Sequence, residues 1–228
     1  MTTGITLAIA LAFICGGYVL GSLSFAVLVS RVMGLADPRT YGSNNPGATN
    51  VLRSGNKAAA LITLLGDALK GAAAVWLASR FAPEFGLGPF TVAVTGLAAF
   101  VGHLYPVFFR FHGGKGVATL FGVLIALQPW LALFTATVWL VVAIFFRYSS
   151  LASITASALA PFFYALVYGF DGTLAVILAM SVLLVSRHQQ NLANLMAGKE
   201  RKIGAARAAV QTKAHGDGKH KDKSTRVA

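Results

Sequence analysis

The chain has 228 residues, of which 56% are hydrophobic and only 11% are charged, and its mean hydropathy is +0.69. Soluble domains carry about a quarter charged residues, so a water-soluble globular fold is excluded and lipid is the natural solvent. Lysine and arginine outnumber aspartate and glutamate by 19 to 7, an excess better explained by a membrane surface than by nucleic acid. The single Cys15 excludes an internal disulfide and a cysteine metal cluster.

The first apolar run, residues 5–30, is uncharged and begins close to Met1. A cleavable signal peptide has a basic start and a shorter apolar region, whereas about 20 apolar residues suffice to span a bilayer. We therefore interpret this run as a retained transmembrane helix.

Five further apolar runs follow, at residues 58–79, 87–109, 117–146, 151–170 and 172–186. Gln128-Pro129 interrupts the run at 117–146, which is either one helix kinked at the proline or two short helices with a tight turn. Positive charge decides between these alternatives, because Lys and Arg collect in short loops on the cytoplasmic side. Both Arg147 and the basic carboxyl-terminal tail lie on the cytoplasmic side only if the run at 117–146 forms two spans.

The sequence therefore predicts an all-α polytopic membrane protein with seven transmembrane helices, the N-terminus outside and the C-terminus cytoplasmic. We expect residues 1–204 to form one seven-helix transmembrane catalytic domain. Residues 205–228 are expected to be a basic, disordered cytoplasmic tail beside anionic lipid, because they are rich in Lys, His and Gly. Binding of metal or nucleic acid by this tail is the less favoured alternative.

The first predicted cytoplasmic loop, residues 41–50, combines Gly, Asn and Pro, which permit tight turns. Its short polar side chains are Ser43, Asn45, Thr49 and Asn50. Arg53 follows with a guanidinium fork suited to phosphate or carboxylate. Taken alone, the stretch is explained equally well as an ordinary polar membrane loop.

The second predicted cytoplasmic loop is the sharper signal, because Gly113-Gly114-Lys115-Gly116 runs directly into an apolar helix with Thr119 on its first turn. Glycines let backbone amides approach an anion, a helix start attracts negative charge, and Lys115 adds a full charge. Lys115 is followed by Gly116 rather than Ser or Thr, so this is not the Walker loop of nucleotide triphosphatases. The pattern indicates a phosphate cradle, with a flexible hinge as the alternative.

Two further polar segments lie on the same predicted side of the membrane. Ser149 and Ser150 could donate to phosphate, although hydroxyls at a helix start more often cap their own backbone. His188 and Asn191 are three residues apart and so share a helical face. Next to two other polar loops, His188 becomes a plausible site group.

Asp67 and Lys70 are charged residues inside the second span. A charge within the bilayer costs several kcal/mol, so we expect the two to form an ion pair and, secondarily, to contribute to the site wall. His103 is expected to hold a loop by hydrogen bonding.

Two classes of function fit these features: an enzyme with a cytoplasmic pocket for a phosphorylated substrate, and a membrane transporter for an organic phosphate. Transporters commonly consist of two related halves with polar groups near the midplane. This chain shows no internal repeat, and its polar groups lie in loops on one side, which favours the enzyme. Neither the His-x4-Asp pair of the common glycerolipid acyltransferases nor a metal-binding set of spaced aspartates is present, so we expect no metal and no cofactor.

Up to about Gly204, the chain resembles the bacterial acyl-phosphate glycerol-3-phosphate acyltransferase family known as PlsY. The motifs that carry the resemblance are Gly42 to Val51 with Arg53, Asp67 with Lys70-Gly71, Gly102-His103 to Phe108, Gly113 to Thr119, the serines after Arg147, and His188 with Asn191 ahead of Glu200 to Ile203. The chain departs from the family pattern at His112, where a lysine is expected, and at Asn194, where an arginine is expected.

The resemblance implies a multi-pass enzyme of the bacterial inner membrane with its site facing the cytoplasm. It would transfer a fatty acyl group from acyl phosphate to glycerol 3-phosphate, in contact with membrane lipid, and the enzyme that makes acyl phosphate is a candidate partner. The expected catalytic residues are Lys115, Arg53, His188 and Ser150. The expected substrate-binding residues are Ser43, Asn45, Gly47, Thr49, Asn50, Gly113, Gly114, Gly116, Thr119, Ser149 and Asn191. The expected structural or site-wall residues are Asp67, Lys70, His103 and Glu200.

Overall fold

The computed structural model describes residues 3–204, which form ten α-helices and three short 3-10 helices without a strand. The α-helices are α1 (Thr3–Gly21), α2 (Phe25–Val32), α3 (Ala48–Val51), α4 (Lys57–Phe81), α5 (Pro89–Leu104), α6 (Val117–Leu127), α7 (Pro129–Phe146), α8 (Ser149–Tyr168), α9 (Gly172–Ser186) and α10 (Gln189–Met196). The 3-10 helices are η1 (Leu52–Ser54), η2 (Ala82–Phe85) and η3 (Val107–Phe109). The all-α class is thus confirmed, whereas the predicted tail at 205–228 lies outside the described residues.

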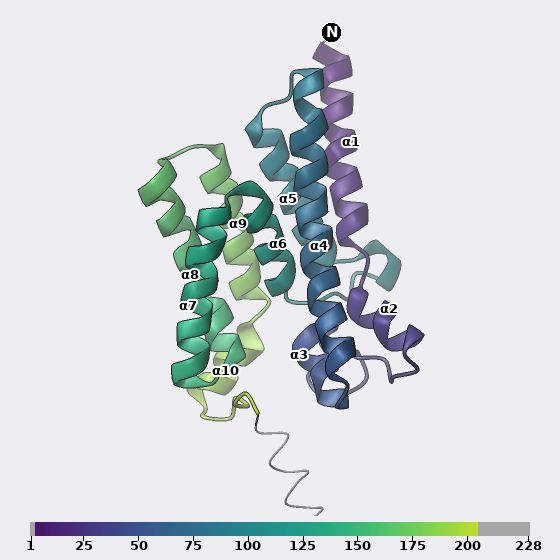
Figure 1. Cartoon of the computed structure of the whole chain (residues 1–228), viewed down its shortest axis with the longest axis vertical. Coiled ribbons are helices and arrows are strands. Elements are labelled where there is room, and N and C mark those ends of the chain that lie inside the picture. Colours follow the sequence, from purple (N-terminus) through teal and green to yellow (C-terminus); the bar gives the residue numbers. More distant parts are fainter. Residues whose placement is uncertain (1–2, 205–228) are drawn as a thin grey trace, which may run out of the picture.

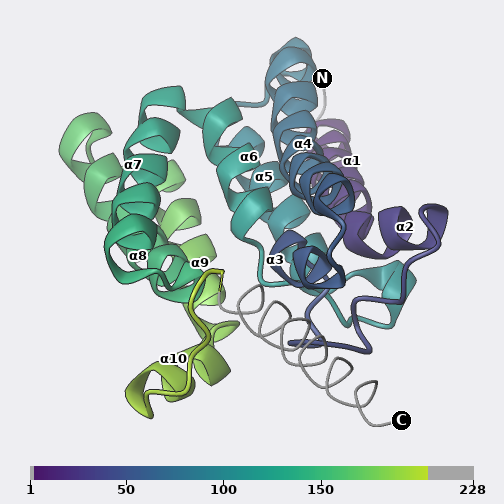
Figure 2. The ribbon, with the colours of Figure 1, turned by 60° about the horizontal axis from the view of Figure 1, so that its bottom comes forward.

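The helices form two halves, one built from α1 to α5 and the other from α7 to α10, with α6 between them (Figure 1). Helices approach closely at glycines: a Cβ on Gly21 of α1 would meet the backbone of Ala99 in α5, and one on Gly122 of α6 would meet the backbone of Ala68 in α4. Small residues at such crossings are the usual basis of helix packing in lipid. The halves meet where α5 packs on α9 and where α6 packs on α7, and the second view shows α5 and α6 near the centre of the molecule (Figure 2).

Two of the predicted boundaries are instructive. The break at Gln128-Pro129 separates α6 from α7, as expected, and Pro129 begins α7, where its missing N–H costs nothing. The prediction of one helix through Ser30 was wrong, because α1 ends at Gly21 and α2 begins only at Phe25. The Lys70 ammonium donates to the Leu23 carbonyl at 2.6 Å, which stabilises this break.

Five helical segments are long and apolar enough to cross a membrane: Thr3–Gly21, Lys57–Phe85, Pro89–Phe109, Pro129–Phe146 and Ser149–Tyr168. Helices α9 and α10 qualify as a sixth only together, with a bend of 56°. Helix α6 has 11 residues and at 1.5 Å per residue is only about 16 Å long, roughly half a bilayer core. By length, the described chain therefore supports five or six spans, fewer than the seven predicted.

Candidate functional site

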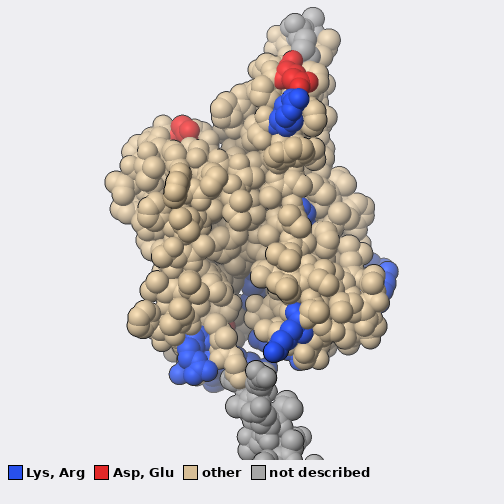
Figure 3. Space-filling model, viewed as in Figure 1, with Lys and Arg blue, Asp and Glu red and all other residues tan. Residues whose placement is uncertain are grey.

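Lysine and arginine gather at one end of the molecule, while the band above it carries few charges (Figure 3). The segments that meet at this end are the loop before α4, the loop between α5 and α6, the junction of α7 and α8, and the chain around α10. Lys115, before α6, and Ser150, after α7, belong to one hydrogen-bonded group. The chain therefore leaves this end along α6 and returns to it along α7.

The centre of the site is a group of four side chains from three of these segments. The Lys115 ammonium donates to the side-chain oxygen Oδ1 of Asn191. The Asn191 amide donates to Glu200 Oε1 at 2.7 Å, and the Ser150 hydroxyl donates to the same oxygen at 2.6 Å. Asn194, which stands where the family pattern has an arginine, adds a weaker contact to Glu200 at 3.4 Å. Glu200 is thus the acceptor that joins the group.

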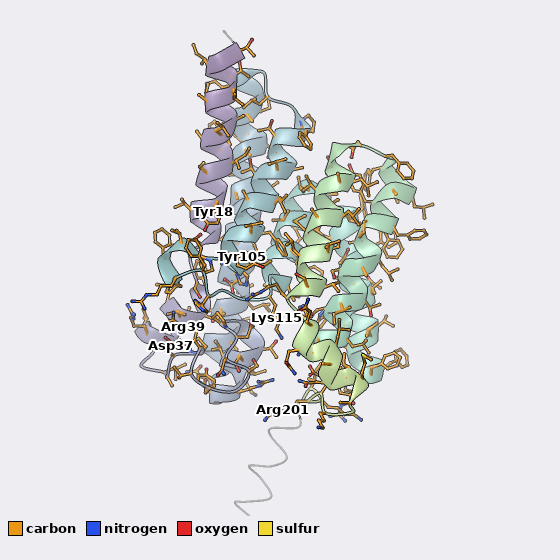
Figure 4. All side chains as sticks on the ribbon, turned by 180° about the vertical axis from the view of Figure 1, so that it is seen from behind. Tyr18, Asp37, Arg39, Tyr105, Lys115 and Arg201 are labelled. Atoms are coloured by element: carbon orange, nitrogen blue, oxygen red, sulfur yellow. The ribbon has the colours of Figure 1, made fainter. Side chains whose placement is uncertain are left out.

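The electrostatics of this group favour an anion. Burial lowers the pKa of Lys115, and the neighbouring charges of Arg53 and Arg187 lower it further, while Glu200 opposes this. Burial likewise lowers the pKa of Arg53, with Arg201 adding to the effect and Glu200 opposing it. Lys115 lies between the two halves, above Arg201 (Figure 4). Several cations therefore surround one carboxylate, and an anionic ligand would relieve their repulsion.

His188 lies between α9 and α10 and is buried. Its Nδ1 is 2.8 Å from the Leu184 carbonyl, which makes Nδ1 the protonated nitrogen and leaves the lone pair on Nε2. Burial lowers its pKa to about 4, so the ring is neutral at physiological pH. It is therefore a weak base.

The glycine loop lies directly on α5. A Cβ on Gly113 would meet the carbonyls of His103 and Leu104, one on Gly114 would meet the His103 ring, and one on Gly116 would meet Phe100. Gly116 also has φ +86°, a left-handed conformation that favours glycine. The glycines are thus required by packing, a reason beyond the anion approach expected from the sequence.

Asn50 organises the loop at 41–50 from within. Its buried amide donates to the carbonyls of Pro38 at 2.7 Å and Tyr41 at 3.0 Å, and its oxygen accepts from the Ser43 N–H at 3.0 Å and from Arg53 at 3.3 Å. Both ends of this side chain are thus engaged within the loop, so Asn50 supports the loop and Arg53, and its expected contact with substrate stays a prediction.

The remaining predicted residues lie at varying distances from the central group. Ser43 and Thr49 are exposed, Asn45 is half-buried, and Gly47 caps the start of α3. Ser149, which starts α8, accepts a hydrogen bond from Ser153 at its carbonyl. Thr119 is buried in α6, and its hydroxyl has no hydrogen-bond partner within residues 3–204.

The charged pair within the second span is confirmed. Lys70 and Asp67 are 2.9 Å apart and almost wholly buried, and His103 Nδ1 is 3.4 Å from the same carboxylate oxygen. The His103 carbonyl accepts from the Gly114 N–H at 3.0 Å, so this residue does hold the glycine loop, through its backbone.

Sequence reasoning gave no role to Arg187, whose guanidinium contacts the carbonyls of Gly113 and Gly114. A positive residue after an apolar helix is explained by membrane orientation alone, so the sequence held no signal for these contacts. A cavity of about 270 Å³ lies at the other end of the molecule, between Pro83, Gly88, Gln128 and Thr173, and is remote from all these groups.

Comparison with known proteins finds relatives that cover most of the chain. A family model described as glycerol-3-phosphate acyltransferase matches residues 11–198. The chain belongs to this family. It is 59% identical over 198 residues to the glycerol-3-phosphate acyltransferase of Ralstonia pickettii, covering 87% of this chain and 96% of that protein. It is 58% identical over 193 residues to that of Herminiimonas arsenicoxydans, covering 85% and 94%.

Among solved structures, the acyltransferase resembles PlsY, an integral membrane glycerol 3-phosphate acyltransferase, in its glycerol 3-phosphate form. The TM-score is 0.81 at 38% identity, covering 88% of this chain and 98% of that one. The lysophosphatidic acid form matches with a TM-score of 0.78 over 85% and 94%. This glycerol-3-phosphate acyltransferase is therefore an integral membrane protein, and its place in phospholipid biosynthesis follows from that activity.

Proposed function

We propose that the protein transfers a fatty acyl group from acyl phosphate to glycerol 3-phosphate, giving lysophosphatidic acid and inorganic phosphate. The observation that carries the proposal is the meeting of Lys115 and Arg53 with the donors of Ser150 and Asn191 at one end of the helices. Glycerol 3-phosphate and lysophosphatidic acid forms of the related PlsY support this acceptor and product. Family membership favours the enzyme over the alternative of an organic phosphate transporter.

The choice of acyl phosphate as donor rests on charge. A thioester donor requires activation of the acceptor hydroxyl, typically by a histidine held by a carboxylate. His188 instead contacts a backbone carbonyl and has a pKa of about 4. The surplus of positive charge suits a donor that is itself an anionic phosphate, and whose phosphate is a good leaving group.

In the proposed reaction, the acceptor hydroxyl oxygen attacks the acyl carbon, and the bond from that carbon to the phosphate oxygen breaks. Lys115 and Arg53 stabilise the departing phosphate, while Ser150 and Asn191 position the substrates. The hydroxyl proton ends on the leaving phosphate, either directly or by way of His188. The low pKa of His188 favours direct transfer. Neither route needs a covalent enzyme intermediate.

For the whole chain, we propose seven membrane crossings, with α6 and α9 completing the five longer spans, the N-terminus outside and the site facing the cytoplasm. Residues 1–204 would form the catalytic domain within a bacterial inner membrane. The enzyme that makes acyl phosphate is a proposed partner, since acyl phosphate hydrolyses readily and gains from direct delivery.

The test is a comparison of donors with purified protein. Acyl phosphate and acyl-CoA are supplied separately with glycerol 3-phosphate, with and without a chelator of divalent cations, while lysophosphatidic acid and phosphate release are followed. We expect equal amounts of both products from acyl phosphate, no dependence on added metal, and little product from acyl-CoA. Comparable rates from acyl-CoA, or strict dependence on a divalent cation, would overturn the proposed donor or mechanism.

A further inference from the structure

Arg187, immediately after α9, connects the two halves of the molecule at the glycine loop. Its NH2 group donates to the Gly113 carbonyl at 3.1 Å, and its Nε donates to the Gly114 carbonyl at 3.3 Å. The guanidinium also lies over the Tyr105 ring, 5.3 Å from the ring centre. Within residues 3–204, no carboxylate lies within ion-pair distance of it. Its donors are therefore directed at backbone rather than at an acid.

These contacts fix the orientation of two successive peptide units. The first unit is held at both ends, because the Gly113 carbonyl accepts from Arg187 and the Gly114 N–H donates to the His103 carbonyl at 3.0 Å. In a planar trans peptide the N–H points opposite to the carbonyl. The contact at the Gly114 carbonyl therefore turns the Lys115 N–H away from Arg187. Within the described chain, this N–H has no acceptor.

We propose that Arg187 is a positioning residue: its guanidinium fork orients the backbone at Gly113 to Lys115, so that the Lys115 amide and side chain face the substrate phosphate. This rests on the proposed function. A fork is needed because two carbonyls on consecutive residues must be held at once. A lysine ammonium is a compact point charge and does not match the spacing of both carbonyls. The same contacts bring the start of α10 against the loop, where Lys115 reaches Asn191.

The charge of Arg187 also acts on the site. It contributes to lowering the pKa of both Lys115 and His188, although burial is the larger cause for each. Removing the charge should therefore raise the pKa of Lys115, whereas exchanging it for lysine should not. This separates the effect of charge from the effect of the fork.

The experiment compares R187K and R187M with the control R110M. Arg110 is an exposed arginine in the same loop region, and its guanidinium has no partner that the described structure shows. We expect both Arg187 variants to raise the KM for the phosphate substrates and lower kcat, each by about tenfold or more, while R110M stays near the wild type. Only R187M should move the alkaline limb of the pH profile upward. Added guanidinium ion should partly restore R187M but not R187K.

Each outcome is decisive. Normal kinetics of R187K, or a fall in kcat alone with unchanged KM and no response to guanidinium, would overturn the positioning role. If R187M does not fold, R187K and Y105L carry the test, with Y105F as the control that keeps the ring. Y105L should raise KM in the same direction as R187K, and unchanged KM in both would likewise overturn the role. Failure of the wild-type protein to use acyl phosphate would instead contradict the proposed function.

Discussion

Lys115 holds the one full positive charge within the glycine loop, and it lies close to Arg53, Asn191 and Glu200. Its replacement by alanine should lower turnover at least about a hundredfold, a loss of roughly 3 kcal/mol of transition-state stabilisation. The matched control is K57A, which removes an exposed lysine at the start of α4, at the same end of the molecule. Near-normal turnover of well-folded K115A would contradict the phosphate cradle.

The pH profile gives a second prediction at the residue scale. Lys115 acts as a cation, so activity is present below its pKa and is lost as the pH rises through it. Burial lowers this pKa from the 10.5 of an ordinary lysine, and the alkaline loss should therefore begin at a lower pH than an unperturbed lysine would give. His188, with a pKa of about 4, should add no limb near neutrality.

This profile is measured as kcat/KM against pH, with uncatalysed hydrolysis of the donor subtracted. K115R should move the alkaline limb upward, because a guanidinium stays charged throughout the range. An alkaline limb at the same pH in K115R and the wild type would assign it to another group.

At the scale of elements, the sequence predicted the features that are determined by residues close together along the chain. The spacing of Asp67 and Lys70 predicted their ion pair, and Gln128-Pro129 predicted the boundary between α6 and α7. The contacts of Arg187 with Gly113 and Gly114 could not be predicted, since more than 70 residues separate the partners and the contact depends on how α9 packs on α5. The inward position of the Asn50 amide could not be predicted either, because the composition of the loop at 41–50 suits a ligand-binding loop equally well.

Gly116 allows a test of the loop as an element. Gly116 and Gly55 both have a positive φ, +86° and +88°, so alanine at either position costs roughly 1–2 kcal/mol of backbone strain. Only at Gly116 would the new Cβ also meet Phe100 and Leu104, whereas around Gly55 the space is open. G116A should therefore be less stable than G55A by about 2 kcal/mol.

The measurement is thermal unfolding of both variants in the same detergent, together with the KM for each phosphate substrate. G116A should lower the melting temperature further and raise KM, while G55A changes only stability. Equal shifts in melting temperature would show that contact with α5 does not hold the loop.

For the whole molecule, the sequence predicted the all-α class and the gathering of polar loops at one end, because hydropathy and charge are read residue by residue. It did not predict that helix lengths would differ so widely. Helix α6 has 11 residues and α4 has 25, so counting apolar runs does not by itself count membrane crossings. The short helix starts at the glycine loop, whose packing on α5 fixes where α6 begins.

Labelling of single cysteines tests the seven crossings. In a C15A background, S54C, H112C and K199C should react with an impermeant thiol reagent only from the cytoplasmic side, and T3C and E84C only from outside. All five positions are exposed. Opposite labelling of T3C and K199C requires an odd number of crossings.

The deciding position is Gln128, between α6 and α7 and beside the cavity at the end remote from the site. If α6 crosses the membrane despite its length, the bilayer must thin locally or the end of α6 must lie in a water-accessible recess. Q128C should then label from outside, while R147C labels from the cytoplasm. Should Q128C stay unlabelled from both sides while E84C reacts from outside, α6 and α7 would form a re-entrant pair. The protein would then have five crossings, with its site still facing the cytoplasm.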